Sequence, residues 1–262
     1  TPIITQPKKA AAALAWLANI SFILYLVLLL GANSQAASGG PLAWWPLWQL
    51  PASDGGWAGV GVVSLLPLLS AVSWLAARGL TGQMKTLAWR PNRVTWPLLC
   101  LAALAALSLA RQCAHGCSVG NGLRLALLLG HLAWVYLYSL NERPPLFSII
   151  VAAIALQSTI ALGQFVAQRD LGLRFLGEPA LDPAVAGISV VMRAGERWLR
   201  AYGLTAHPNV LAGSLVPLLL ALPALGRPPS ALRRGIVPFV FALGGAALLA
   251  TLSRWALVCF AL

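Results

Sequence analysis

Residues 196–213 have the sequence ERWLRAYGLTAHPNVLAG and join the longest polar loop of the chain to an apolar run. The segment holds two arginines, Arg197 and Arg200, and a His-Pro-Asn turn at 207–209. A helix that begins near Asn209 presents free backbone N–H groups and the positive end of its dipole. Together with the arginines, these groups predict a place where an anion, phosphate above all, binds at a membrane surface.

The composition around this segment is that of an integral membrane protein. Hydrophobic residues make up 59% of the chain and charged residues 9%, and the mean hydropathy is +0.80. A soluble domain carries roughly 25% charged residues. The net charge of +12 does not indicate nucleic acid, because the basic residues lie in short loops between apolar runs rather than on one basic face.

Seven apolar runs are long enough to span a bilayer, which takes about 20 residues each. An eighth run begins at Trp255, and we expect the chain to be a piece of a longer protein. The predicted fold is therefore all-α: a polytopic transmembrane helical bundle that forms a single domain over residues 1–262. The seven spans are expected at 10–30, 57–77, 96–112, 123–140, 145–166, 209–225 and 236–252.

The loops between these runs predict the orientation. Every second loop is basic, which places the N-terminus and those loops in the cytoplasm. Five further arginines lie in the single external loop 167–208, against this topology signal: Arg169, Arg174, Arg193, Arg197 and Arg200. We interpret this external positive charge as a means of binding an anionic substrate.

The external loop also contains a predicted β-hairpin. Residues 187–193 and 196–202 form two β-prone arms around Ala194-Gly195. Alternation along the second arm puts three side chains on one face: Trp198, Arg200 and Tyr202. Gly203 then frees the backbone to turn toward the helix.

A second arginine is expected on the same side of the membrane. The stretch 236–262 is apolar except at Ser253-Arg254. One helix of that length would overshoot the bilayer and leave Arg254 inside it, which is costly. We therefore predict two helices, with Ser253 capping the second and Arg254 at the external surface near Arg200. For Arg254, the simpler alternative is a side chain that snorkels to the membrane surface. For Arg200, it is a loop arginine that contacts lipid headgroups, with an Asn209 that only caps its helix.

Other polar residues give weaker signals. Gln157, Gln164 and His131 lie within spans, where polar groups usually hold helices together, although Gln164 is near the outer end and can reach the site. Cys113, His115 and Cys117 lack a fourth ligand, so no metal site is expected, and a disulfide or two free thiols fits better. No cofactor is expected. The sequence offers no Ser-His-Asp set, no phosphate-binding glycine loop and no paired carboxylates.

At Arg200–Gly203, followed by His207–Ala212, the chain resembles the O-antigen ligase and polymerase family. Thr251–Arg254 is similar to that family's Ser-Arg motif at the end of a later span, with Trp255 in place of the usual small residue. Gln164 matches the family's Gln near the end of the preceding span. The resemblance covers about residues 145–262.

The resemblance implies a metal-independent glycosyltransferase of the bacterial inner membrane. Such an enzyme moves a glycan from undecaprenyl diphosphate to an acceptor hydroxyl, on a lipid or a glycan, at the outer face. Its catalytic base lies in a later external loop, which is expected beyond Leu262, so no catalytic residue is assigned in this chain. The resemblance assigns substrate binding to six residues, Gln164, Arg200, Gly203, His207, Asn209 and Arg254, and the positive charge of the loop adds Arg197 to them.

Three alternatives remain open at this point. An O-antigen polymerase of the same family would carry the same motifs. A lipid-linked oligosaccharide flippase or other transporter would also use external arginines, but should show polar or broken segments through several spans. A structural subunit predicts no clustering of Arg200 and Arg254.

Overall fold

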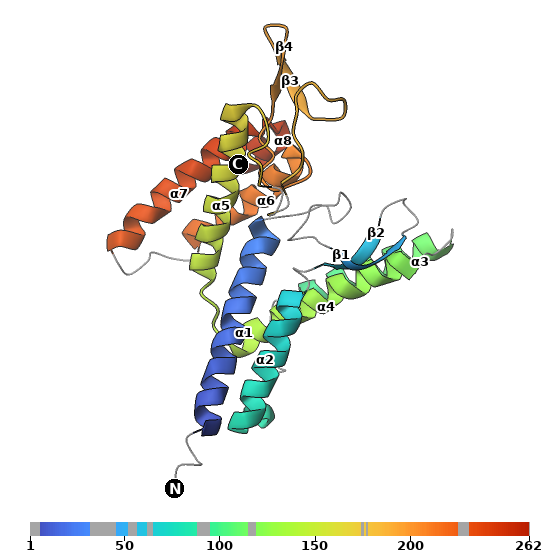
Figure 1. Ribbon diagram of the computed structural model, residues 1–262, viewed down its shortest axis with the longest axis vertical. Helices are drawn as coiled ribbons and strands as arrows, with labels where there is room; N and C mark the ends of the chain where they lie inside the picture. Colours follow the sequence, from blue (N-terminus) through green and yellow to red (C-terminus); the bar gives the residue numbers. More distant parts are fainter. Residues whose placement is uncertain are drawn as a thin grey trace. The chain divides into compact units, whose positions relative to one another are not determined.

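The computed structural model describes residues 6–31, 46–51, 57–61, 65–87, 95–114, 119–173, 176, 178–224 and 231–261. These residues are mostly helical, with two antiparallel sheets of two strands each (Figure 1). The chain divides into two compact units. The first unit contains Thr1–Tyr25 and Pro46–Pro144, and the second contains Leu26–Trp45 and Pro145–Leu262.

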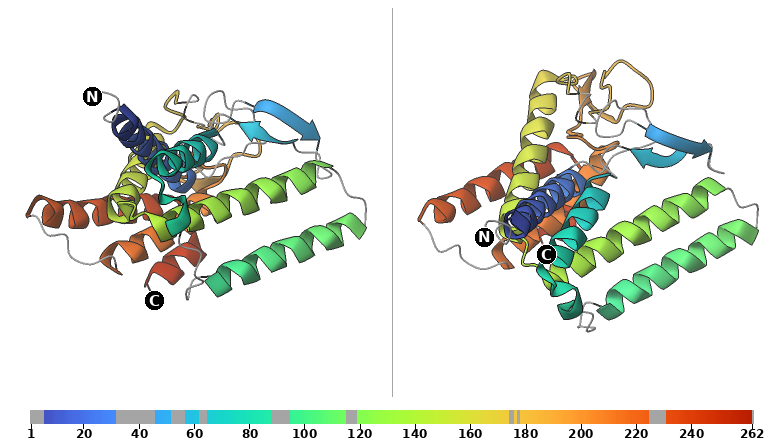
Figure 2. Two further views of the ribbon diagram at one scale, coloured as in Figure 1. Left: turned by 90° about the horizontal axis from the view of Figure 1, so that it is seen from below. Right: turned by 60° about the horizontal axis from the view of Figure 1, so that its bottom comes forward.

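The first unit is built from helices around an aromatic core. Phe22 stacks on Tyr138 with ring centroids 4.0 Å apart, and Trp74 and Trp134 pack beside Tyr138. The helices α3 and α4 lie side by side (Figure 2). The elements of this unit are α1 (Gln6–Gly31, up to Tyr25 in this unit), β1 (Pro46–Pro51), β2 (Trp57–Gly61), α2 (Leu65–Thr81), the 3₁₀ helix η2 (Gln83–Thr86), α3 (Thr95–Ala114) and α4 (Val119–Asn141).

The span predicted at 57–77 is wrong in its first part. Residues 57–61 form β2, which pairs antiparallel with β1, and helix α2 begins only at Leu65. The segment WAGVG contains two glycines, which weaken a helix, and β1 supplies a partner for its backbone groups. A hydropathy pattern registers only how apolar these residues are, so it could not separate a strand from a helix here.

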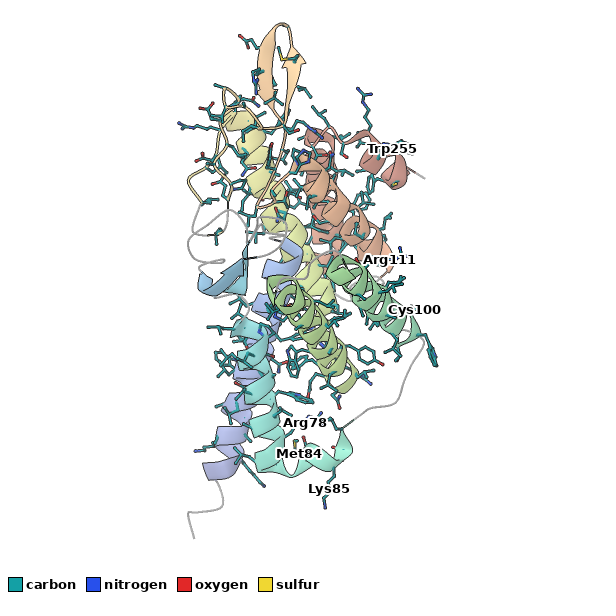
Figure 3. All side chains as sticks on the ribbon, turned by 90° about the vertical axis from the view of Figure 1, so that its right-hand side faces the viewer. Arg78, Met84, Lys85, Cys100, Arg111 and Trp255 are labelled. Carbon is teal, nitrogen blue, oxygen red and sulfur yellow. The ribbon has the colours of Figure 1, made fainter. Side chains whose placement is uncertain are left out.

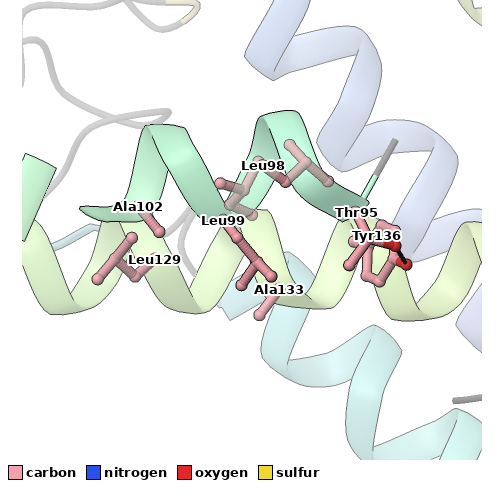
Figure 4. A pocket seen from close by; sticks show the side chains of 8 residues that line it. Thr95, Leu98, Leu99, Ala102, Leu129, Ala133 and Tyr136 are labelled. Carbon is pink, nitrogen blue, oxygen red and sulfur yellow. Dashed lines mark hydrogen bonds between the residues drawn. The ribbon is translucent and has the colours of Figure 1, made fainter. Parts of the chain in front are cut away.

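Two pockets lie between helices of the first unit. One is an apolar groove of about 280 Å³ between α3 and α4, where residues at helical spacing face each other (Figure 4). Thr95 and Tyr136 line it and are joined by a hydrogen bond between their hydroxyls. The other pocket, of about 320 Å³, lies between α2 and α4 and is lined in part by His131 and Trp134.

The second unit packs three helices around a buried core. Gly244 of α7 allows this close approach, because a Cβ there would lie 2.7 Å from Leu219 of α6 and 2.9 Å from Ile154 of α5. The core continues into α8. The elements of this unit are α5 (Leu146–Ala167), β3 (Val190–Arg193), β4 (Glu196–Leu199), α6 (Pro208–Ala224), α7 (Ala231–Ala250) and α8 (Arg254–Ala261).

Two local predictions in the second unit are confirmed. The loop forms a β-hairpin, in which β3 pairs with β4 around Ala194 and Gly195, and it projects beyond the helices of its unit (Figure 1). Both turn residues have positive φ, at 50° and 88°, as a two-residue hairpin turn requires. The stretch after residue 236 is divided into α7 and α8, and α8 begins at Arg254, directly after Ser253, as the prediction of two helices requires.

Within the described residues, two helices are long and apolar enough to cross a membrane: Lys8–Val27 and Leu146–Ala167, with mean hydropathies of 2.0 and 2.1. Only 33% and 39% of the residues in their most apolar segments are buried within the protein. Most of these apolar residues therefore remain to be covered by another apolar environment. Other described helices also expose large apolar side chains, such as Leu68, Trp96 and Phe239. These features support association with a membrane. The bundle of seven spans remains a prediction.

Candidate anion-binding site

Arg200 lies at the point where the hairpin meets the helices of the second unit. It follows the last residue of β4, Leu199, which is fully buried. The next residue, Ala201, is also fully buried, and its N–H donates to the Ala250 carbonyl at the end of α7 (3.0 Å). The backbone on both sides of Arg200 is therefore fixed against the core.

Three acceptors from three separate segments hold the Arg200 guanidinium. Its Nε donates to the Thr251 carbonyl (2.6 Å), Nη1 to Ser189 Oγ (2.8 Å) and Nη2 to Asn209 Oδ1 (2.8 Å). Ser189 precedes β3, Asn209 lies in the first turn of α6, and Thr251 follows α7. The structure thus brings the two sequence motifs around Arg200 and Thr251–Arg254 into direct contact.

All three acceptors are electrically neutral. No described carboxylate pairs with Arg200, and the one ion pair found among the described residues joins Arg78 to Glu142 in the first unit. Burial lowers the pKa of Arg200 from its ordinary value, and the neighbouring Tyr202 acts in the opposite direction. An arginine stays protonated at neutral pH even so. The site therefore carries a positive charge that its own residues do not neutralise.

His207, and not Asn209, caps helix α6. The helix begins at Pro208, and the His207 carbonyl accepts the N–H groups of Val210 and Leu211. The His207 Nδ1 accepts the N–H of Asn209 (3.2 Å). Burial lowers the pKa of His207, and the positive charge of Arg200 lowers it further. The neutral imidazole, whose Nδ1 can accept a hydrogen bond, is therefore favoured. Because His207 caps the helix, the Asn209 side chain is available to accept the hydrogen bond from Arg200.

The turn beneath the site depends on Gly203. This residue has φ of +60°, and a Cβ at this position would lie 2.2 Å from Gln157 Oε1. Gln164 clamps the same residue, since its Oε1 accepts the Gly203 N–H (2.8 Å) and its Nε2 donates to the Gly203 carbonyl (2.9 Å). Gln157 Oε1 accepts the Leu204 N–H (2.9 Å). The two glutamines therefore bind the loop backbone, where the sequence favoured helix–helix contacts.

A buried carboxylate supports this turn from the other side. Glu178 is only 4% exposed and accepts hydrogen bonds from Gln164 Nε2 (2.7 Å) and from the backbone N–H groups of Leu171 and Leu173. Gln164 is itself fully buried. Its contribution is therefore to position the loop, and the structure gives it no surface on which a ligand could lie.

Some residues of the hairpin region lie beside Arg200, and others contact other parts of the loop. Tyr202 is buried beside Arg200, and its hydroxyl accepts the Ser189 N–H (2.5 Å). Trp198 lies under the Arg193 guanidinium instead, 4.7 Å from its ring centre. Arg197 donates to the carbonyls of Pro183 (2.5 Å) and Val185 (3.2 Å). The expectation that Trp198 and Tyr202 flank Arg200 is therefore met for Tyr202, and Arg197 holds the upstream loop.

Arg254 is the first residue of α8, three residues after the Thr251 that binds Arg200. Three residues span at most about 11 Å of chain, so both arginines lie at the same end of α7. The Arg254 side chain is exposed, and no described residue forms a hydrogen bond or ion pair with it. The adjacent Trp255 is 83% exposed on α8 (Figure 3).

Sequence patterns did not reveal Ser189 or Glu178 as parts of this site, and they marked Thr251 only as a member of the Thr251–Arg254 motif, without its contact to Arg200. Thr251 contributes a backbone carbonyl, which any residue carries, so its identity holds no signal. Ser189 lies in an arm that was recognised only as β-prone. Glu178 was one of six acidic residues, and its burial was the feature that mattered.

Comparisons with protein-family models, curated proteins and solved structures found no match. Among the described residues, no group of three His, Cys, Asp or Glu side chains is placed to hold a metal ion. The segment with Cys113, His115 and Cys117 lies outside the side chains that the structure describes. The Arg200 site is therefore the feature of the molecule that indicates a function.

Proposed function

We propose that this protein is a membrane glycosyltransferase of the O-antigen ligase type, which binds the diphosphate of an undecaprenyl-linked glycan donor at Arg200. One observation carries the proposal: Arg200 is fixed by three neutral acceptors and keeps its full positive charge. A fixed cation without an acidic partner is suited to an anionic ligand. The resemblance of the same segments to the ligase and polymerase family supports phosphate as that anion.

The chemistry needs such a cation. The bond between the sugar's anomeric carbon and the phosphate oxygen breaks, and the acceptor oxygen bonds to that carbon. Negative charge grows on the departing diphosphate, so a guanidinium held in place stabilises the transition state more than the ground state. The acceptor hydroxyl gives its proton to a base, which the family resemblance places in a later loop. Arg254, at the same end of α7, is available as a second cation.

The proposal places the protein in a bacterial inner membrane, with the N-terminus in the cytoplasm and the loop 167–208 outside. Exposed apolar faces of its helices support the membrane, and the distribution of basic residues supports the orientation. Cysteines introduced at the hairpin tip should react with a membrane-impermeant reagent added from outside. Labelling only after the membrane is opened would show that the loop lies in the cytoplasm, which is the opposite orientation.

The experiment that tests the function compares Arg200→Ala and Arg200→Lys in the full-length protein, in cells that report glycan transfer. Removal of one positioned donor or cation to a developing oxyanion costs about 10²–10³-fold in rate, so the Ala variant should lose transfer at least on this scale. The Lys variant keeps the charge without the fork and should fall between. Arg193→Ala, which removes an arginine from the exposed hairpin, is the matched control.

Wild-type transfer by Arg200→Ala, with the control equally active, would end the proposal. A second outcome separates the transporter alternative. If purified protein in liposomes moves lipid-linked oligosaccharide across the bilayer and Arg200→Ala abolishes that movement, while no glycan is transferred, the site serves transport instead.

A further inference from the structure

We propose that Asn209 sets the charge of the Arg200 site: together with Ser189 it positions the guanidinium through neutral oxygens, and thereby reserves the positive charge for a phosphate-bearing ligand. This inference rests on the proposed function and adds the residues that determine its selectivity for anions. Asn209 is here a positioning residue, and it acts on the ligand through Arg200.

The Arg200 guanidinium has N–H donors left for a ligand. A guanidinium carries five N–H donors. Arg200 uses three of them, on Nε, Nη1 and Nη2, for Thr251, Ser189 and Asn209. One N–H on each terminal nitrogen is left. Two donors on neighbouring nitrogens match two oxygens of one phosphate group, which is the geometry that makes arginine selective for phosphate and carboxylate.

The acceptor at position 209 is an amide oxygen and not a carboxylate oxygen. An aspartate at 209 would accept the same hydrogen bond from Nη2 and bind more tightly, because it would add the attraction between opposite charges to that bond. It would also suit the first turn of α6, where negative charge interacts favourably with the helix dipole. Stability alone therefore favours a carboxylate at this position. The chain has an amide there, as a site that must attract an anion requires.

Among the described residues, no other group at the site supplies a negative charge to Arg200. The Asn209 backbone N–H is bonded to His207 Nδ1, and burial together with the charge of Arg200 lowers the pKa of His207. The remaining contacts of Arg200 are a hydroxyl and a carbonyl. The single change of one amide to a carboxylate is thus enough to convert a cationic site into a neutral one.

The test uses the chain in nanodiscs of phosphatidylcholine, with inorganic pyrophosphate as the probe in calorimetric titration and with thermal unfolding measured in parallel. Asn209→Asp should weaken pyrophosphate binding by at least about tenfold. The new carboxylate repels the bound anion, and the repulsion between two unit charges about 4 Å apart in partly buried surroundings exceeds the free energy of a tenfold change in affinity. Its melting temperature should equal or exceed that of the wild type. Ser189→Asp places a carboxylate on the opposite terminal nitrogen and should weaken binding in the same way.

Arg193→Gln is the matched control, because it changes the net charge by the same amount from the exposed hairpin. It should leave pyrophosphate affinity within about twofold of the wild type, since exposed charges are strongly screened. Repeating the titration in phosphatidylglycerol nanodiscs separates the two sources of phosphate. Competition by these headgroups would show that lipid phosphate occupies the site, and its absence supports a diphosphate donor.

The outcomes distinguish this inference from the function on which it rests. If the wild type binds pyrophosphate and both carboxylate variants bind it equally well, Asn209 and Ser189 do not set the charge, and only the inference is overturned. If Asn209→Asp melts below the wild type, the amide is there for stability and the inference is also wrong. If the wild type does not bind pyrophosphate at all, the anion site of the proposed function is wrong, and the inference falls with it.

Discussion

Each unit of the protein contains a half-buried arginine that is held by several contacts, and the two are held in opposite ways. In the first unit, Arg78 forms an ion pair with Glu142 (3.2 Å) and lies 4.4 Å from the ring centre of Trp74. Trp74 Nε1 donates to the same carboxylate oxygen (2.7 Å). Arg78 lies near Met84 and Lys85, where α2 and η2 end (Figure 3). In the second unit, the described residues that bind Arg200 are all neutral.

The difference shows how a structural arginine can be told from a binding one. A charge that only joins two helices is best neutralised, because an unpaired charge away from water is costly. Glu142 does this for Arg78. Arg200 is fixed at least as firmly, yet no carboxylate in the part of the chain that the structure describes neutralises its charge. The protein thus tolerates an unfavourable arrangement in the second unit, and such local cost is typical of functional sites.

The largest expected effect contrasts the glycines beside the two arginines. Gly82, after α2, has φ of +70° and open space around it, whereas Gly203 has φ of +60° and lies against Gln157. Gly82→Ala should cost about 1–2 kcal/mol of unfolding free energy, from the backbone alone. Gly203→Ala should cost about 2–5 kcal/mol, because Gln157 must also move and release Leu204. Denaturant unfolding in detergent, followed by tryptophan fluorescence, measures both.

Equal losses for the two alanine variants would show that the turn at Gly203 is no more constrained than the one at Gly82. The rigid support inferred for Arg200 would then have to come from the Gln164 clamp alone.

An intermediate effect is expected where the first arginine loses its counter-charge. Glu142→Gln keeps an acceptor for Arg78 and Trp74 but removes the ion pair, whose side chains are 12% and 35% exposed. Because such a partly exposed pair is screened by solvent, the variant should lose only about 0.5–1 kcal/mol. Pyrophosphate binding should stay unchanged in titration. A new or stronger pyrophosphate site in this variant would show that any unpaired arginine of the chain binds anions, and would remove the distinction between Arg78 and Arg200.

The smallest effect concerns pH and belongs to the second unit. The pKa of His207 is lowered from 6.5 by burial and by Arg200, so the unfolded chain binds a proton more readily than the folded one. Stability should therefore be full above pH 6.5 and decrease as pH falls from 6.5 toward the lowered pKa. Pyrophosphate bound at Arg200 should raise the pKa of His207, which NMR titration of the imidazole measures.

His207→Gln serves as the control, because its amide oxygen can still accept the Asn209 N–H and does not titrate. The loss of stability on acidification should be smaller in this variant. If the variant and the wild type lose stability in parallel between pH 7 and 5, the acid sensitivity has another origin.

Local signals in the sequence were sufficient for the elements near the site. Gly195 between β-prone arms predicted the hairpin, because glycine readily adopts the positive φ of its turn, whereas the positive φ of Ala194 is one that alanine rarely adopts. Ser253-Arg254 predicted the break between α7 and α8, because a charge is costly within an apolar run. The same reasoning failed at residues 57–61, where the backbone partner that makes a strand lies in another part of the chain.

The sequence alone contains the components of the site: arginines in a polar loop, a glycine before the turn, and a helix start at His-Pro-Asn. These follow from nearest-neighbour chemistry, in which charge, backbone freedom and capping act over a few residues. Only the tertiary structure decided which of those residues meet. Ser189, Asn209 and Thr251 are separated by up to 62 positions and converge on one guanidinium. That convergence depends on how α6 and α7 pack, and so does the decisive property of Arg200: three neutral partners and no counter-ion among the residues that the structure describes.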